Sequence, residues 1–238
     1  MTSEIAEAYE IVRAGDAASV FLTCEHASER LPGAWRWPDP DRRLIGTHWA
    51  FDLGAADLTR ELAARLRAVA VLSRFSRLLV DPNRAEHEAS LFREVAEGEP
   101  VLLNAKLGPE DRERRLVEYY RPFHAAIDRE VANTRATTLL SVHSFTDVYE
   151  GARRTLEVGV LFDREDALGE ALVRAFDSAG FRAAPNEPYS GKAGLIHSAA
   201  THAAARGLRA VEIEVRQDLA VTAPFRARVT DVLARALA

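Results

Sequence analysis

Apolar and polar positions along this chain follow two periods in turn, which predicts strands and helices that alternate. Short apolar runs at 20–24, 69–72, 78–80, 137–142 and 156–162 are typical of buried strands, and 208–215 alternates valine and isoleucine with glutamate. Between these runs, apolar residues recur at helical spacing. Strand and helix patterns that alternate predict one α/β domain over residues 1–238, with a mixed or largely parallel sheet.

The helical patterns begin and end at residues that suit helix termini. We expect helices from near Asp52 and over 109–135, 166–179, 198–206 and 222–237. Pro122 predicts a kink or a break in the second of these. Gly207 is the expected C-terminal glycine of one helix, and Thr222 is the expected N-cap of the last. Residues 85–109 read as a surface excursion, and 183–194 have the composition of a functional loop.

Composition narrows the class of protein. The chain has 238 residues, 47% hydrophobic and 28% charged, which is typical of a soluble globular enzyme. A net charge of −5 gives no reason to expect nucleic acid or a membrane as partner. The acidic N-terminus does not resemble a signal peptide, and no apolar run approaches the roughly 20 residues that span a bilayer. The single cysteine, Cys24, excludes an internal disulfide, favours the cytoplasm and is expected to be a buried small hydrophobe. The oligomeric state stays open.

Two of the expected strands are followed by histidine. His26 comes after the strand at 20–24, with Glu29 three positions on, and His143 comes after the strand at 137–142. Ligands of α/β proteins bind outside the carboxyl ends of strands. Catalytic zinc sites use three imidazole or carboxylate ligands and keep one open position. The pattern predicts a zinc site of His26, Glu29 and His143, against the alternative that both histidines cap strand ends.

A second candidate is the segment Arg77-Leu-Leu-Val-Asp-Pro-Asn-Arg84. Its two arginines and Asn83 suit a carboxylate clamp, because a guanidinium matches that group with two hydrogen bonds. Spacing alone favours a surface salt-bridge cluster. Asp81 is equally suited to hold a histidine ligand in orientation.

A third candidate is the pair Glu212 and Glu214, which share one face of their expected strand. A carboxylate beside the activated water is the usual general base of zinc hydrolases. The alternation alone predicts solvent-facing side chains, and it does not choose between the two. His48 and Asp52 lie near an expected helix start, where they either line the site or cap the helix.

Five motifs, in this order, resemble those of the N-formylglutamate amidohydrolase family and together cover about residues 18–220. The family is similar to the wider zinc carboxypeptidase-like group, which includes aspartoacylases. The motifs are Cys24-Glu-His-Ala-Ser-Glu-Arg-Leu-Pro32, His48-x-x-x-Asp52-x-Gly-Ala55, Ser76-Arg-Leu-Leu-Val-Asp-x-Asn-Arg84, Val142-His-Ser-Phe-Thr146 and Glu212-Ile-Glu-Val-Arg-x-Asp218.

The resemblance implies a three-layer α/β/α domain, zinc carboxypeptidase-like, with one zinc ion per chain. The zinc ligands it implies are His26, Glu29 and His143. It places the carboxylate-binding pair at Asn83 and Arg84 and the general base at Glu214. Members of the family often have Asn at the position of Glu29 and Pro at the position of Asp147.

The expected function is therefore a zinc-dependent hydrolase that cleaves the amide of a small N-acyl, acidic amino acid. We expect Arg77 or Arg216 to stabilise the oxyanion, and Tyr189 to help Asn83 and Arg84 bind the substrate carboxylate. The alternatives are a carboxypeptidase-like or other amide hydrolase with the same zinc site, and a non-catalytic ligand-binding relative.

Overall fold

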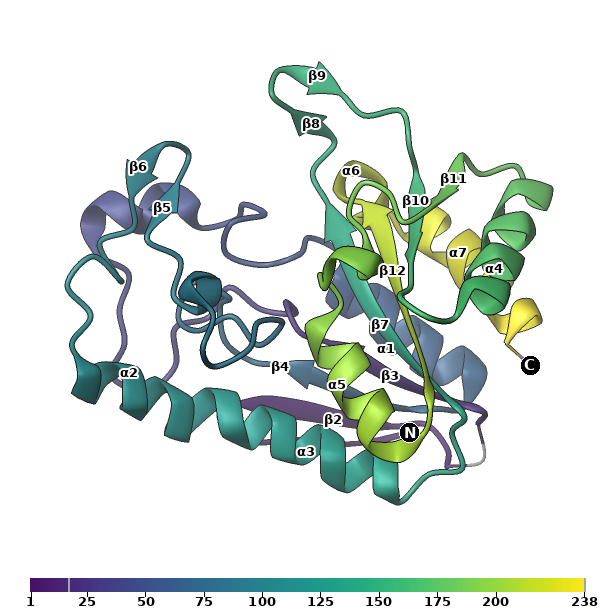
Figure 1. Ribbon diagram of the computed structural model, residues 1–238, viewed down its shortest axis with the longest axis horizontal. Helices are drawn as coiled ribbons and strands as arrows, with labels where there is room; N and C mark the ends of the chain where they lie inside the picture. The colour runs from purple at the N-terminus through teal and green to yellow at the C-terminus, as the bar shows by residue number, and fades with distance from the viewer. Residues whose placement is uncertain (17, 238) are drawn as a thin grey trace.

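The computed structural model describes residues 1–16 and 18–237, and within them eight strands form a central sheet in the order β1-β2-β4-β3-β7-β12-β10-β11 (Figure 1). The central strands β4, β3, β7 and β12 are parallel to one another. β2 and β10 run antiparallel to this group at its two sides. The strands of the sheet are β1 (Thr2–Ile5), β2 (Tyr9–Arg13), β3 (Val20–Cys24), β4 (Val69–Ser73), β7 (Thr138–Phe145), β10 (Val158–Leu161), β11 (Ala183–Pro185) and β12 (Arg209–Arg216).

Helices cover both faces of the sheet. One face packs against α1 (Ala55–Leu66), α4 (Asp166–Ser178) and α7 (Ala223–Ala236), and the other against α3 (Arg121–Ala132) and α5 (His197–Arg206). The shorter helices are α2 (Pro109–Arg115) and α6 (Gln217–Ala220). Two small hairpins, β5 (Val95–Ala96) with β6 (Glu99–Pro100) and β8 (Val148–Tyr149) with β9 (Ala152–Arg153), stand out from the body (Figure 1). The expected α/β class, with a mixed and largely parallel sheet, is confirmed.

The α3–α5 face of the sheet changes character along its strands. At its amino end this face is apolar, with Phe21 and Leu139 in the core beside Phe123 of α3. Towards the carboxyl ends of the strands, the same side of β7 carries Ser141 and His143, which are buried polar groups. A pocket of polar chemistry therefore replaces the apolar core at this end of the sheet.

The expected strand at 78–80 is wrong, because these residues form a buried turn. Ser76 organises the turn: its Oγ donates to the carbonyl of Ala50 (2.8 Å) and accepts from the Leu78 N–H (3.2 Å). The apolar side chains made the segment look like a strand, but burial alone does not distinguish a strand from a packed turn.

Pro122 changes the type of helix that precedes it and does not break the helix in two. α2 and α3 continue as one rod (Figure 1), joined by a π-helical turn at Leu116–Tyr120 that ends two residues before the proline. Proline donates no backbone hydrogen bond and crowds the preceding turn, so the wider turn accommodates it.

Other boundaries differ from the sequence patterns. β7 runs to Phe145, so His143 lies inside the strand rather than after its end. The hairpin of β1 and β2, which extends one side of the sheet, was not predicted. In the described part of the chain, no helix combines the length and apolar character needed to cross a membrane.

Candidate metal centre and adjoining cavity

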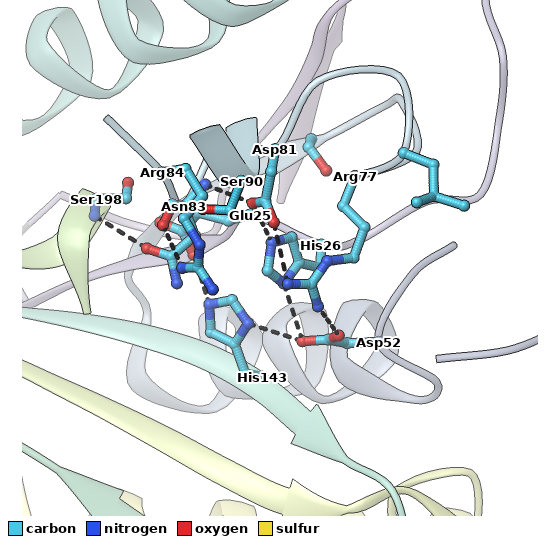
Figure 2. Close-up of polar contacts among 12 residues, drawn as sticks. Glu25, His26, Asp52, Arg77, Asp81, Asn83, Arg84, Ser90, His143 and Ser198 are labelled. Atoms are coloured by element: carbon cyan, nitrogen blue, oxygen red, sulfur yellow. Dashed lines mark hydrogen bonds and ion pairs between the residues drawn. The ribbon is translucent and has the colours of Figure 1, made fainter. Parts of the chain in front are cut away.

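The expected chemistry converges where the parallel strands end. His26 follows β3, the segment from Arg77 to Arg84 follows β4, and His143 projects from the carboxyl-terminal half of β7 (Figure 2). Glu214 lies in the carboxyl-terminal half of β12. Since these strands are parallel, their carboxyl ends meet at one edge of the sheet. The edge borders a cavity of about 600 Å³ lined by His26, His143, Glu212 and Glu214.

Two buried histidines form the centre of the site, and a carboxylate faces the Nε2 atom of each imidazole ring. The ring centroids of His26 and His143 lie 4.8 Å apart. His26 Nε2 lies 2.7 Å from Asp81 Oδ1, and His143 Nε2 lies 3.1 Å from Glu25 Oε2. Both Nδ1 atoms face Asp52 Oδ2, at 3.4 Å for His26 and 2.7 Å for His143 (Figure 2). Metal-binding histidines are usually oriented in this way, by a carboxylate on the nitrogen that does not bind the metal.

Asp52, not Glu29, completes the group with the two histidines. Possible ligand atoms of His26, Asp52 and His143 all lie within 4.8 Å of one another. Glu29 does not line the cavity, and its Oε2 instead accepts a hydrogen bond from the Gly46 N–H at 2.5 Å. The backbone after His26 leaves its turn at once and runs on irregularly, so the spacing of three does not bring Glu29 back to the histidine. The expected grouping of Glu29 with His26 and His143 does not occur among the residues that the structure describes.

The chemistry of this cluster fits a divalent cation. Its carboxylates outnumber its cations: Glu25, Asp52, Asp81, Glu212 and Glu214 are all buried around the two imidazoles and Arg77. Buried polar atoms also lack a hydrogen-bond partner in residues 1–16 and 18–237, namely His26 Nδ1, Glu25 Oε1, Glu212 Oε2 and Glu214 Oε2. Buried charges are stable when they are paired or bind a metal. A cation beside His26 Nδ1 would compensate the excess negative charge.

The pKa values in the cluster reflect its burial and its crowding of charge. Burial raises the pKa of Glu212 to about 7 and raises the pKa of Glu214 well above its usual value. Burial alone would lower the pKa of His143, but the carboxylates of Glu212, Asp52 and Glu25 outweigh it and raise that pKa. Perturbed pKa values of this kind mark functional clefts more often than ordinary surfaces.

Glu212 and Glu214 both line the cavity, with different charged neighbours. Glu212 Oε2 lies 3.5 Å from His143 Nε2, and the negative charge of Glu25 contributes to the raised pKa of Glu212. The charge of Glu214 instead acts on Arg77 and Tyr189, which line the cavity. The prediction of solvent-facing glutamates is wrong, since both are buried.

The segment after β4 supplies the cavity with arginine. Arg77 donates to Asp81 (3.0 Å) and lies 3.5 Å from Asp52, so its charge is already paired. Arg84 lines the cavity and donates from Nη1 to the carbonyl of Asn83 (2.8 Å). Asn83 also lines the cavity, but its side-chain amide connects to α5 by donating to the Leu195 carbonyl and accepting from the Ser198 N–H.

The structure brings Tyr189 to the cavity but not Arg216. Tyr189 lines the cavity mouth from the 183–194 loop. Arg216 is buried, is absent from the cavity lining and is paired with Asp218 (2.7 Å). Its Nη1 also donates to the carbonyls of Arg154, Thr155 and Leu156. These partners occupy the Arg216 guanidinium away from the cavity where it was expected to act.

Two residues of the site were not predicted. Glu25 accepts from Ser141 Oγ (2.5 Å) as well as facing His143. The sequence signal that identifies Glu25 is its position next to His26 at the end of a strand. Arg93 lines the cavity from the 85–109 segment, where no pattern in the sequence distinguishes it from its charged neighbours.

Solved structures share this fold over nearly the whole chain. A gene product of Agrobacterium tumefaciens is 30% identical and superposes with a TM-score of 0.90, covering 98% of this chain and 94% of its own. The N-formylglutamate amidohydrolase of Ralstonia eutropha is 20% identical, with a TM-score of 0.74 and 97% coverage of both chains. A bacteriophage poly-γ-glutamate hydrolase is 13% identical, with a TM-score of 0.50 over 98% of this chain and 89% of its own. The architecture is thus one that hydrolases use.

The particular family follows from the sequence match. The N-formylglutamate amidohydrolase family matches residues 18–221, so this chain belongs to that family. A search of the curated proteins finds no match. The resemblance carried by the five motifs is confirmed.

Proposed function

We propose that this chain is a zinc-dependent amidohydrolase that cleaves the amide of an N-acyl, N-formyl-like acidic amino acid. Family membership supports amide hydrolysis. The observation that supports a zinc requirement is the buried group of His26, Asp52 and His143. A further carboxylate faces the Nε2 atom of each imidazole.

His26, Asp52 and His143 would hold the metal, and two imidazoles with one carboxylate match a catalytic zinc site. Zinc would supply Lewis acidity, by which it polarises the acyl carbonyl and activates a water molecule near pH 7. Asp81 would orient the His26 ring, and Glu25 the His143 ring, each through the Nε2 atom of the histidine.

Glu214 is the proposed general base. Both glutamates of β12 line the cavity, and the charge of Glu214 acts on Arg77 and Tyr189. Its carboxylate would accept the proton of the attacking water and deliver it to the leaving amine. Arg77 would stabilise the negative charge that develops on the acyl oxygen. Arg84 would bind the substrate carboxylate, beside Tyr189 at the mouth, while Asn83 keeps the segment against α5.

The metal assignment is tested by the zinc content of the purified protein. We expect about one zinc per chain, with loss in His26→Ala, His143→Ala and Asp52→Asn. Glu29→Gln is the matched control and should keep its zinc, because Glu29 contacts Gly46 instead. Zinc retained by Asp52→Asn and lost by Glu29→Gln would restore the ligand set that the sequence predicts.

The reaction is tested with N-formyl, N-acetyl and N-succinyl amino acids beside unmodified peptides. Turnover of the N-acyl compounds, abolished when zinc is removed, is the expected result. Turnover of unmodified peptides alone would establish a carboxypeptidase-like activity instead.

A further inference from the structure

Three arginines line the cavity, and only one of them has its charge paired by the protein. Arg77 forms ion pairs with Asp81 and Asp52. For Arg84 and Arg93, no carboxylate among the described residues lies within ion-pair distance, and both line the cavity. Two guanidinium groups therefore face this space without a counter-charge, which is what a ligand with two negative groups requires.

A buried hydrogen-bond network holds the backbone at Arg93 in place. The Arg93 carbonyl accepts from Asn104 Nδ2 at 2.8 Å, and Asn104 Oδ1 accepts from Arg115 Nη1 at 2.6 Å. Arg115 is only 1% exposed and also donates to the carbonyls of Leu79 and Leu103. This network holds the cavity wall in place, so the position of Arg93 does not depend on a mobile surface loop.

The side chain of Arg93 is held as well. Its guanidinium carbon lies over the Trp49 ring, 5.4 Å from the centroid, and Trp49 also lines the cavity. A guanidinium above an aromatic ring keeps its in-plane N–H donors available for a carboxylate. Arg93 is thus presented to the cavity in the form that binds an anion with two hydrogen bonds.

The surroundings of Arg93 favour an anion. Burial, followed by the positive charges of Arg77 and Arg84, lowers the pKa of Arg93. A half-buried guanidinium among like charges is stabilised when a negative group binds beside it. The Arg93 guanidinium lies over Trp49, has no carboxylate partner in the part of the chain that the structure describes and belongs to a fixed segment of backbone. Each of these features suits the binding of a ligand carboxylate.

We propose that Arg93 determines specificity by binding the side-chain carboxylate of an acidic substrate, while Arg84 binds the α-carboxylate. The assignment rests on the proposed function, since it takes the ligand to be an N-acyl amino acid. The substrate class is then an N-acyl dicarboxylic amino acid, and the same amino acid with an amide side chain is discriminated against.

Kinetics with a matched pair of substrates tests this role. The ratio of kcat/KM for N-formylglutamate over N-formylglutamine should fall about 10- to 100-fold in Arg93→Met, the loss expected for hydrogen bonds to a charged group. Arg84→Met should lower kcat/KM for both substrates. Arg164→Met, at a side chain that is 88% exposed and outside the cavity lining, is the control and should leave the ratio as it is. An unchanged ratio in Arg93→Met would overturn the proposal.

Binding without turnover separates this inference from the proposed reaction. Calorimetry of the zinc-loaded protein should show tighter binding of glutarate than of its monoamide, and Arg93→Met should remove the difference. Arg93→Lys, which keeps the charge but not the planar fork, should keep part of it and covers the case in which Arg93→Met does not fold. A binding difference in a protein that hydrolyses no N-acyl amino acid would retain Arg93 and reject the amidohydrolase. Equal binding of both compounds by the wild type would reject the role of Arg93 alone.

Discussion

Individual side chains in this site gain their roles from what surrounds them. Asp52 is a metal-ligand candidate because both Nδ1 atoms of the histidine pair face its Oδ2. Arg216 does not line the cavity, and Asp218 and three carbonyls bind its guanidinium. Glu212 and Glu214 differ by one strand repeat, and both are buried and line the cavity. Glu212 Oε2 lies 3.5 Å from His143 Nε2, and the charge of Glu214 acts on Arg77 and Tyr189.

The general base can be assigned by comparing two isosteric changes. Glu214→Gln should retain zinc and lose about 100- to 10,000-fold in kcat, the usual contribution of a positioned base. Glu212→Gln should have a smaller effect on kcat. Zinc content and steady-state kinetics of both variants check this. Nearly normal turnover in Glu214→Gln with a large loss in Glu212→Gln would move the role to Glu212.

Cys24 should be unreactive in the folded protein. Its side chain is fully buried, in the core on the α1 side of the sheet, which confirms the expectation of a small hydrophobe. Burial raises the pKa of Cys24 to about 12, and the carboxylates of Glu25 and Asp52 add to this. A raised pKa leaves the thiol neutral and unreactive at pH 8. Alkylation by iodoacetamide, followed by mass spectrometry, should be on the order of 100-fold slower than in urea. Equal rates would show that Cys24 is accessible.

At the scale of elements, the packing of helix ends against one another determines whether the site residues meet at the carboxyl edge of the sheet. α1 begins directly after the metal-ligand candidate Asp52, at an N-cap glycine with φ 80°. A Cβ on Gly54 would come within 2.4 Å of the Ala220 carbonyl in α6. This close approach fixes the start of α1 against the end of α6, near Asp52.

Two glycines with positive φ provide a matched test of this joint. Gly54→Ala should lower the free energy of unfolding by about 2–4 kcal/mol, from left-handed strain together with overlap against α6. Gly207→Ala, also left-handed (φ 66°) but with open space around it, should cost about 1–2 kcal/mol from strain alone. Denaturant unfolding of both variants measures the difference. Equal losses would mean that the contact with α6 relaxes without cost.

At the scale of the whole molecule, the proposed metal connects parts of the chain that are far apart in sequence. His26 follows β3, Asp52 precedes α1 and His143 lies in β7. Without a cation, these segments meet around buried carboxylates that outnumber their partners. The folded state should therefore be stabilised by the ion and weakened by its removal.

Removal of the metal should lower the Tm, and added zinc should restore it. Zinc at about 100 times its Kd contributes about 2.7 kcal/mol, which corresponds to roughly 5–10 °C for a chain of this size. Thermal melts with and without a chelator measure the shift, and Asp52→Asn should show little of it. A Tm that does not respond to the chelator in the zinc-containing wild type would contradict a structural contribution of the metal.

The amino-acid sequence alone determined the elements whose patterns are local. The strand at 20–24 and the α5 helix with its terminal Gly207 follow from side-chain periodicity and backbone chemistry. The order of the motifs was enough to identify the family.

Only the tertiary structure decided which side chains meet. The spacing of two residues in the sequence gives only their separation along the chain. Whether their side chains meet in a site depends on the path of each loop and on the residues packed against it. Glu29 is three residues from His26 but contacts Gly46, while Asp52, far along the chain, faces both histidines. Arg93 faces the cavity for the same reason: a buried network of distant residues, centred on Arg115, holds its segment there.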